Sequence, residues 1–142
     1  MIARLLVLLF GGIWKVQKKC LTSNQLFSKF YIFIYNYYQF EHGSTVSYKI
    51  IYSGKLIFPR GIKQVVIADD VRFGKDCTVY QQVTIDKDLL KDSRVAKAPN
   101  IGNNCIIYPG AKIIGDLTIG NDVIIGANAV VLNDIADNVV VK

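Results

Sequence analysis

The second half of the chain repeats in units of six residues. In residues 101–132, IGNNCIIYPGAKIIGDLTIGNDVIIGANAVVL, a large aliphatic side chain stands at every sixth position from Ile101 to Val131. Neither the 3.6-residue period of an α-helix nor the two-residue alternation of a pleated strand produces this spacing. Glycine, asparagine and aspartate recur between the aliphatic positions, which is typical of a short strand followed by a tight turn.

Three such units would complete one turn of a triangular coil. The first residue of each unit then points inward and stacks on its equivalent three units later, while the backbone bonds to the coils above and below. Ile107 is therefore predicted to lie against Ile125, and Ile113 against Val131, at the usual strand spacing of about 4.8 Å. We predict a mainly β protein built as a parallel β-helix of about three to four coils.

The six-residue register breaks in residues 86–100, DKDLLKDSRVAKAPN. Ile85 and Ile101 are sixteen positions apart, which is not a multiple of six, so the segment between them must leave the coil as an extruded loop. If Ile101 resumes on the face after that of Ile85, Cys77 and Cys105 lie on neighbouring coils of one face. A plain core pair and a reactive pair are the two interpretations of these cysteines.

Residues 1–45 lack the repeat and are apolar, basic and aromatic. MIARLLVLLFGGIWK is too short to span a bilayer, which takes about 20 apolar residues, and no secretory cleavage site follows it. FSKFYIFIYNYYQF, residues 27–40, suits either a docked helix or a strand. We expect residues 1–45 to form a helical segment on the end of the coil and residues 46–142 to form the β-helix. A peripheral membrane contact through the lysine-flanked apolar N-terminus is the alternative.

Charge is distributed unevenly along the chain. Residues 1–68 hold nine Lys and Arg residues against one acid, whereas residues 69–142 hold eight against ten aspartates. No nucleic-acid-binding motif accompanies the basic half, so nucleic acid is not the predicted partner. The three cysteines, Cys20, Cys77 and Cys105, have no metal-type spacing. We therefore expect no metal site, and reduced thiols in a cytoplasmic protein.

The order of these segments resembles one family. DDVRFGKDCTVYQQVTI, the loop ending KAPNIGNN, and GAKIIGDLTIGNDVIIGANAVVLNDIADN are similar to the hexapeptide-repeat acyltransferases of the serine acetyltransferase-like branch, which includes sugar O-acetyltransferases of polysaccharide biosynthesis. The resemblance covers residues 55–141. It implies a left-handed parallel β-helix that assembles as a homotrimer. It also implies acetyl transfer from acetyl-CoA to a hydroxyl group in a cleft between subunits.

Two histidine positions of the family differ in this sequence. In the family the general base is the histidine of a P-H-G segment just before a strand. The matching text here is FPRGIKQVVI, which places Arg60 at that position. A guanidinium stays protonated and has no lone pair with which to accept a proton. His42, the only histidine in the chain, is the candidate substitute. Serine-specific members carry a second histidine where this chain has Ala98, which favours a saccharide or another small hydroxylic acceptor over serine.

The resemblance also assigns positions to acetyl-CoA. The family presents small residues and backbone N–H groups to the pantetheine arm, but the matching text here is YPGAKI, in which Tyr108 is bulky and proline has no N–H. The later GANAVV keeps the small residues, and the family's G-x-P-A-K tail has no counterpart. The cofactor positions implied are Pro109, Gly110, Ala111, Gly126 and Ala127.

Two hypotheses of different class follow. The first is an acetyl-CoA-dependent O-acetyltransferase of reduced activity, in which Arg60 binds an anionic acceptor or the CoA phosphates and Lys97 and Lys112 add positive charge. The second is a catalytically silent β-helix that serves as a binding or assembly subunit, or a truncated gene product. Arg60, Pro109 and the missing tail motivate the second hypothesis.

Overall fold

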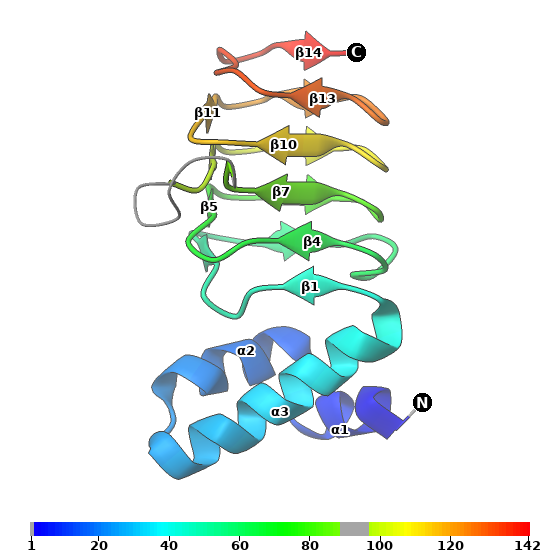
Figure 1. Ribbon diagram of the computed structural model, residues 1–142, viewed down its shortest axis with the longest axis vertical. Coiled ribbons are helices and arrows are strands. Elements are labelled where there is room, and N and C mark those ends of the chain that lie inside the picture. The colour runs from blue at the N-terminus through cyan, green and yellow to red at the C-terminus, as the bar shows by residue number, and fades with distance from the viewer. Residues whose placement is uncertain (1, 89–96) are drawn as a thin grey trace.

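The computed structural model describes residues 2–88 and 97–142, and in these residues three helices precede a three-sided coil of short parallel strands (Figure 1). The helices lie at the end of the coil that carries the first strand, and the chain then climbs the coil one turn at a time. None of the helices in this part of the chain is long and apolar enough to cross a bilayer. The helices are α1 (Ile2–Leu9), α2 (Ile13–Thr22) and α3 (Gln25–His42).

Capping groups define both ends of α3. The side chain of Asn24 accepts a hydrogen bond from the N–H of Phe27 (3.2 Å), and Gly43 ends the helix in the left-handed region with φ of 58°. The segment 27–40, which suited either helix or strand, is thus helical. The side chains buried between the three helices are Val7, Val16, Cys20, Ile34 and Tyr35.

The coil has three flat faces, here named A, B and C, and the described residues contribute fourteen strands to them. Face A holds β1 (Thr45–Val46), β4 (Val66–Ile67), β7 (Thr84–Asp86), β10 (Lys112–Ile114) and β13 (Val130–Val131). Face B holds β2 (Ile51–Tyr52), β5 (Arg72–Phe73), β8 (Asn100–Ile101) and β11 (Thr118–Ile119). Face C holds β3 (Leu56–Ile57), β6 (Cys77–Val79), β9 (Ile106–Ile107), β12 (Ile124–Ile125) and β14 (Val140–Val141).

The structure has the predicted fold, a left-handed parallel β-helix, and its strand register follows the six-residue spacing. Ile107 pairs with Ile125 on face C, and Ile113 pairs with Val131 on face A, as the six-residue spacing requires. All four side chains are buried, because successive first positions of the repeat point into the prism. The aliphatic columns therefore form the core, and backbone hydrogen bonds join the coils along each face.

The coil begins earlier than the regular repeat indicates. Faces A and C each hold five strands among the described residues, which exceeds the three to four coils expected from the sequence. The additional coil is β1 to β3, and its spacing is longer than in the next coil. From Ile57 to Val66 the chain takes nine positions, whereas their partners Thr78 and Thr84 are six positions apart. These three extra residues hide the coil from a search for six-residue units.

The register also shows where the extruded loop leaves the coil. Ile85 pairs with Ile113 and Ile101 pairs with Ile119, so sixteen positions in one coil match six positions in the next. Ile101 thus resumes on the face after that of Ile85, as predicted. Most of the expected loop, residues 89–96, lies outside the described residues.

Two buried glutamines join the helices to the first coil. The side-chain amide of Gln39 on α3 accepts a hydrogen bond from the N–H of Val46 and donates one to the carbonyl of the same residue (2.8 Å). Gln17 on α2 donates to the carbonyl of Tyr48 (2.7 Å). These bonds satisfy strand-edge groups that would otherwise be exposed or unpaired, so the helices cover one open end of the coil.

Candidate functional site at one corner of the coil

The predicted site residues gather along one edge of the prism. This edge, named the C–A corner, contains the turns that lead from face C to face A, and backbone hydrogen bonds link each turn to the next. Going up the coil, the N–H of Gln64 donates to the carbonyl of His42 (3.1 Å), and the N–H of Gly110 donates to the carbonyl of Gln81 (3.2 Å). The turns that make up the corner are residues 58–65, 80–83, 108–111 and 126–129.

His42 lies at the lower end of this corner, where α3 meets β1. Its Nδ1 is 2.7 Å from the carbonyl of Tyr38, and its half-buried ring stacks on the ring of Tyr38 at 4.2 Å. A carbonyl oxygen only accepts, so Nδ1 must carry the proton of the neutral imidazole and Nε2 must carry the lone pair. Nε2 has no hydrogen-bond partner in the part of the chain that the structure describes. The geometry is that of an oriented base.

Arg60 occupies the longest turn of the same corner. The N–H of Gly61 donates to the carbonyl of Phe58 (3.0 Å), and Gly61 adopts φ of 69°, which glycine tolerates without strain. Arg60 is exposed and forms no ion pair with any described residue. It lies in the turn that is three residues longer than its counterpart in the next coil. A permanently charged, unpaired guanidinium at this position can bind an anion but cannot accept a proton.

The positions assigned to acetyl-CoA lie higher on the corner, and the coil itself explains their small size. A Cβ atom on Gly110 would come within 2.0 Å of Oδ1 of Asn128, and one on Gly126 would come within 2.9 Å of the carbonyl oxygen of Val141. Pro109, which has no N–H, accepts from the N–H of Asn128 through its carbonyl (3.0 Å). Glycine is thus favoured at 110 by its φ of 77° and at 126 by the backbone of the next turn, whether or not a ligand binds. Ala111 is buried in the core and Ala127 is exposed.

Two tyrosines give this corner an aromatic edge. The rings of Tyr80 and Tyr108, on neighbouring coils, stack in parallel with centroids 5.4 Å apart and planes 2° from parallel. Tyr108 is 39% exposed, so part of the stack faces outward. An exposed aromatic face of this kind is the type of surface on which a sugar ring or a nucleobase can stack.

Sequence reasoning missed one polar group at this corner. The Oε1 atom of Gln81 is buried and receives no hydrogen bond from any described residue. Beside it, Nζ of Lys112 donates to the carbonyls of Gln82 (2.9 Å) and Gly110 (3.0 Å), which fixes an ammonium group that has no acidic partner in the described chain. A buried acceptor without a protein donor is uncommon, and an ordered water or a ligand N–H or O–H would satisfy it. The signal in the sequence was only the pair of glutamines in YQQVTI.

Ala98 and Lys97 lie at a different edge, where face A turns into face B. They line a polar cavity of about 270 Å³, in which Nζ of Lys97 is 3.8 Å from a carboxylate oxygen of Asp116 and Nζ of Lys87 is 3.2 Å from one of Asp70. Within one chain this cavity is not part of the C–A corner. Lys97 therefore has an ordinary surface ion pair, whereas Lys112 belongs to the candidate site.

The cysteines form no metal centre and no disulfide. Cys77 and Cys105 lie on neighbouring coils of face C, and each directs its Sγ atom at the carbonyl of a glycine on the adjoining coil (3.1 Å). Both are buried, and the hydrogen bond with Cys77, together with burial, raises the pKa of Cys105. Burial also raises the pKa of Cys20 to about 11. All three are free, and the described residues contain no cluster of His, Cys, Asp and Glu suited to a metal ion.

The chain is similar to known proteins in sequence. Residues 98–133 match the family model described as bacterial transferase hexapeptide (six repeats). The serine acetyltransferase of Staphylococcus xylosus is 44% identical over 71 residues, and that of Helicobacter pylori (strain ATCC 700392 / 26695) is 42% identical over 72 residues. These alignments cover 50% of this chain but only 32% and 40% of the two relatives. The matched segment is thus less than half of each relative.

Solved structures show the same fold. Serine acetyltransferase isoform 3 from Entamoeba histolytica, in complex with cysteine, superposes with a TM-score of 0.73 and 25% identity over 91% of this chain and 45% of that one. The serine acetyltransferase of Neisseria gonorrhoeae superposes with a TM-score of 0.74 and 20% identity, over 89% of this chain and 46% of that one. The resemblance therefore includes the helices as well as the coil.

Proposed function

We propose, from the premise that this chain is a hexapeptide-repeat protein of the serine acetyltransferase-like branch, that it transfers an acetyl group from acetyl-CoA to a hydroxyl group of a small acceptor. The premise rests on the matched repeat and on the fold. The activity is a proposal, because the chain covers only 32% to 40% of the first relatives' lengths. The observation that carries it is the oriented imidazole of His42 at the C–A corner.

Transfer from a thioester to an alcohol requires one proton to move twice. As the acceptor oxygen attacks the acetyl carbonyl, Nε2 of His42 takes the hydroxyl proton. The tetrahedral intermediate then collapses, the C–S bond breaks, and the imidazolium returns the proton to the departing CoA sulfur. The hydrogen bond from Nδ1 to the Tyr38 carbonyl holds the tautomer that this step needs. His42 thereby replaces the base that Arg60 cannot provide.

The same corner offers groups that bind the two substrates. Arg60 and the fixed ammonium of Lys112 are unpaired cations that suit the phosphates of CoA or an anionic acceptor. The orphan Oε1 of Gln81 suits an amide N–H of the pantetheine arm or the acceptor hydroxyl. The Tyr80 and Tyr108 stack gives a flat surface for a ring.

We expect a saccharide hydroxyl rather than serine as the acceptor. The relatives are serine acetyltransferases, so serine is the first alternative to test. In this chain the methyl group of Ala98 stands where serine-specific members carry a histidine, and a methyl group neither binds a carboxylate nor moves a proton. The exposed tyrosine stack at the C–A corner favours a ring-shaped acceptor, as in polysaccharide biosynthesis.

A homotrimer is the proposed assembly. The outward side chains of Val130, Leu132 and Val140 are 57% to 62% exposed and leave apolar strips on the flat sides of the upper coils. Packing these sides in a ring would bring the C–A corner of one subunit near the corner of its neighbour that carries Ala98. The three free cysteines suit a reducing compartment, so we place the trimer in the cytoplasm.

The proposal includes a peripheral contact with an anionic membrane through the helical end. α1 and α3 expose many large apolar side chains, while residues 1–68 hold nine basic residues and one acid. This combination of an apolar surface with basic flanks is typical of segments that lie in the bilayer interface. The exposed side chains are Ile2, Leu5, Leu8, Leu9, Leu26, Phe27, Phe30, Phe33 and Phe40.

The alternative, a catalytically silent binding or assembly subunit, is favoured by Arg60 and by the missing N–H at Pro109. The test is release of free CoA from acetyl-CoA in the presence of serine and of a panel of sugars. If His42 is the base, His42→Asn lowers the rate by about 10² to 10⁴-fold, and the exposed Lys29→Gln on α3 leaves it unchanged. Arg60→His raises the rate if a base at that position is what the chain lacks. No CoA release with any acceptor, and no CoA binding by calorimetry, leaves the silent subunit.

A further inference from the structure

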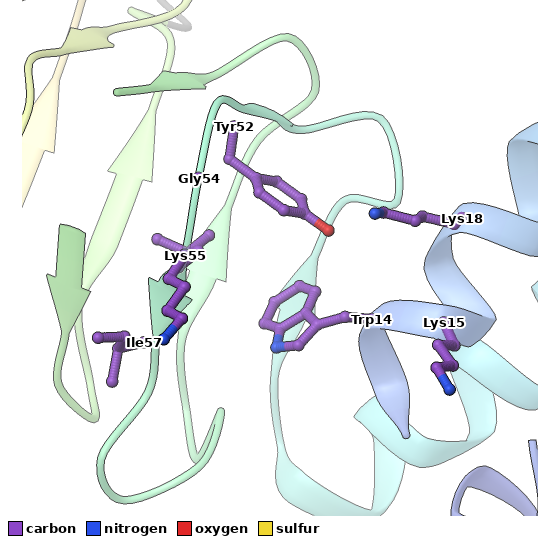
Figure 2. Close-up of a pocket in the computed structure, with 8 residues that line it drawn as sticks. Trp14, Lys15, Lys18, Tyr52, Gly54, Lys55 and Ile57 are labelled. Atoms are coloured by element: carbon purple, nitrogen blue, oxygen red, sulfur yellow. The ribbon is translucent and has the colours of Figure 1, made fainter. Parts of the chain in front are cut away.

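A separate cavity lies where α2 meets the first coil. Its volume is about 410 Å³, within the range of small-molecule sites, and it opens at the turn that leads from face B to face C (Figure 2). It is lined by neither His42 nor any position assigned to acetyl-CoA. The side chains that give the cavity its character are Trp14, Lys15 and Lys18 from α2, and Tyr52, Lys55 and Ile57 from the coil.

One wall of the cavity is apolar and held in place by aromatic packing. The indole of Trp14 packs edge-on against Tyr52 (centroids 5.9 Å apart) and lies tilted on Phe58 (5.3 Å). The hydroxyl of Tyr52 donates a hydrogen bond to Oε1 of Gln17 (3.3 Å), which orients the tyrosine ring. Ile57, 43% exposed, extends the wall along β3. Contact of these apolar side chains with a hydrocarbon chain would remove their surface from water, which is favourable.

The charged side chains that line this cavity are all lysines. Lys18 extends from α2 toward the Tyr52 ring and Lys55 extends from the coil on the other side of Trp14, while the Lys15 side chain points away from both (Figure 2). Within the described chain neither Lys18 nor Lys55 has an ion pair, and the N–H of Trp14 has no acceptor. No acidic residue is among the described residues that line the cavity. The cavity therefore lacks a group that carries negative charge.

We propose that this cavity binds an amphiphilic anion, a hydrocarbon chain that ends in a phosphate or a carboxylate. The head would accept hydrogen bonds from Lys18, Lys55 and the indole N–H, and the first part of the chain would lie on the wall formed by Trp14, Tyr52 and Ile57. Neither the anionic head nor the hydrocarbon chain suffices alone. A free phosphate makes no contact with the apolar wall, and a neutral amphiphile leaves the lysines unpaired.

The single tryptophan makes the test direct, because Trp14 fluorescence reports only on this wall. The full chain is titrated with hexyl, octyl and decyl phosphate, with inorganic phosphate and with octyl glucoside, all below their micelle concentrations. We expect saturable binding of the alkyl phosphates that tightens by about four-fold per added CH₂ until the wall is covered. Inorganic phosphate should bind at least tenfold more weakly than octyl phosphate, and so should octyl glucoside.

Variants separate the charge from the wall. Lys18→Gln and Lys55→Gln should each weaken octyl phosphate by about tenfold and leave octyl glucoside unchanged, because each removes one charge-assisted hydrogen bond. Lys142→Gln, on an exposed position at the other end of the coil, is the matched control and should change nothing. Equal affinity for octyl phosphate and octyl glucoside, tight binding of inorganic phosphate, or indifference to both lysine variants would overturn the proposal. The assay needs no acetyl transfer, so it is independent of the proposed activity.

Discussion

Two adjacent valines on β13 give a direct measure of how much the inward column stabilises the coil. Val131 points into the prism, pairs with Ile113 and is 2% exposed, whereas Val130 points outward and is 62% exposed. Val→Ala at either position removes the same two methyl groups from the same strand. The intrinsic preference of valine for a strand is therefore lost equally in both variants, and only the burial differs.

The expected magnitude follows from the burial. Removing two buried carbons loses about 1.6 kcal/mol of transfer free energy, and the cavity left inside a tightly stacked column adds to this, so Val131→Ala should lower the free energy of unfolding by about 1.5 to 3 kcal/mol. Val130→Ala should lower it by about 0.5 kcal/mol or less, because the side chain is already hydrated.

Urea unfolding followed by circular dichroism, with all proteins at one concentration, measures the difference between the two variants. Equal losses at Val130 and Val131 would refute the assignment of inward and outward positions on which the prism rests. Repeating the experiment at several protein concentrations shows whether Val130 also contacts another subunit. A loss at Val130 that shrinks on dilution would support the trimer, since a subunit contact contributes less stability when the subunits are dilute.

Three further outcomes are expected. Asn104 adopts φ of 55° and donates a side-chain hydrogen bond to Asp122 (3.0 Å). Asn104→Val and Asn104→Gly both lose this bond, so the Val variant should be about 1 to 2 kcal/mol less stable than the Gly variant in urea because of the strained backbone alone. A hydrogen bond from Ser47, together with the charge of a neighbouring lysine, lowers the pKa of Asp69. The contribution of Asp69 to folding stability is therefore present above about pH 4 and is lost as pH falls through the lowered pKa. The stability difference between wild type and Asp69→Asn should shrink on acidification below about pH 4. In vesicle flotation the chain should float with anionic but not zwitterionic vesicles, and Leu5→Ser with Phe33→Ser should abolish flotation; equal flotation with both lipids, or none, would contradict the membrane contact.

The repeat predicted most of the fold from short-range information. Each six-residue unit specifies by itself which side chain points inward, so the contacts of Ile107 with Ile125 and of Ile113 with Val131 followed from the spacing. The return of Ile101 to the next face followed from the length of the interruption. The first coil did not follow, because the three extra residues in the turn that holds Arg60 remove the six-residue spacing there.

The candidate site depended far more on tertiary structure. The resemblance to the family named Arg60 and the acetyl-CoA positions, and His42 was named only because it is the sole histidine. That all of them share the C–A corner, and that His42 has a fixed tautomer with a free Nε2, depends on how α3 joins the coil. That Oε1 of Gln81 is buried without a hydrogen-bond donor depends on how the turns stack. Their catalytic and binding roles stay predictions until the CoA-release assay is done.

The sequence by itself determined that the second half of this chain must coil with a period of three hexads, and which side chains fill the interior. A periodic pattern encodes this because inward and outward orientation is a local property of each residue. Only the tertiary structure decided where the helices end, how the long turn around Arg60 fits the first coil, and which turns meet at one corner. These depend on hydrogen bonds and packing between segments far apart in the chain, which no local pattern specifies.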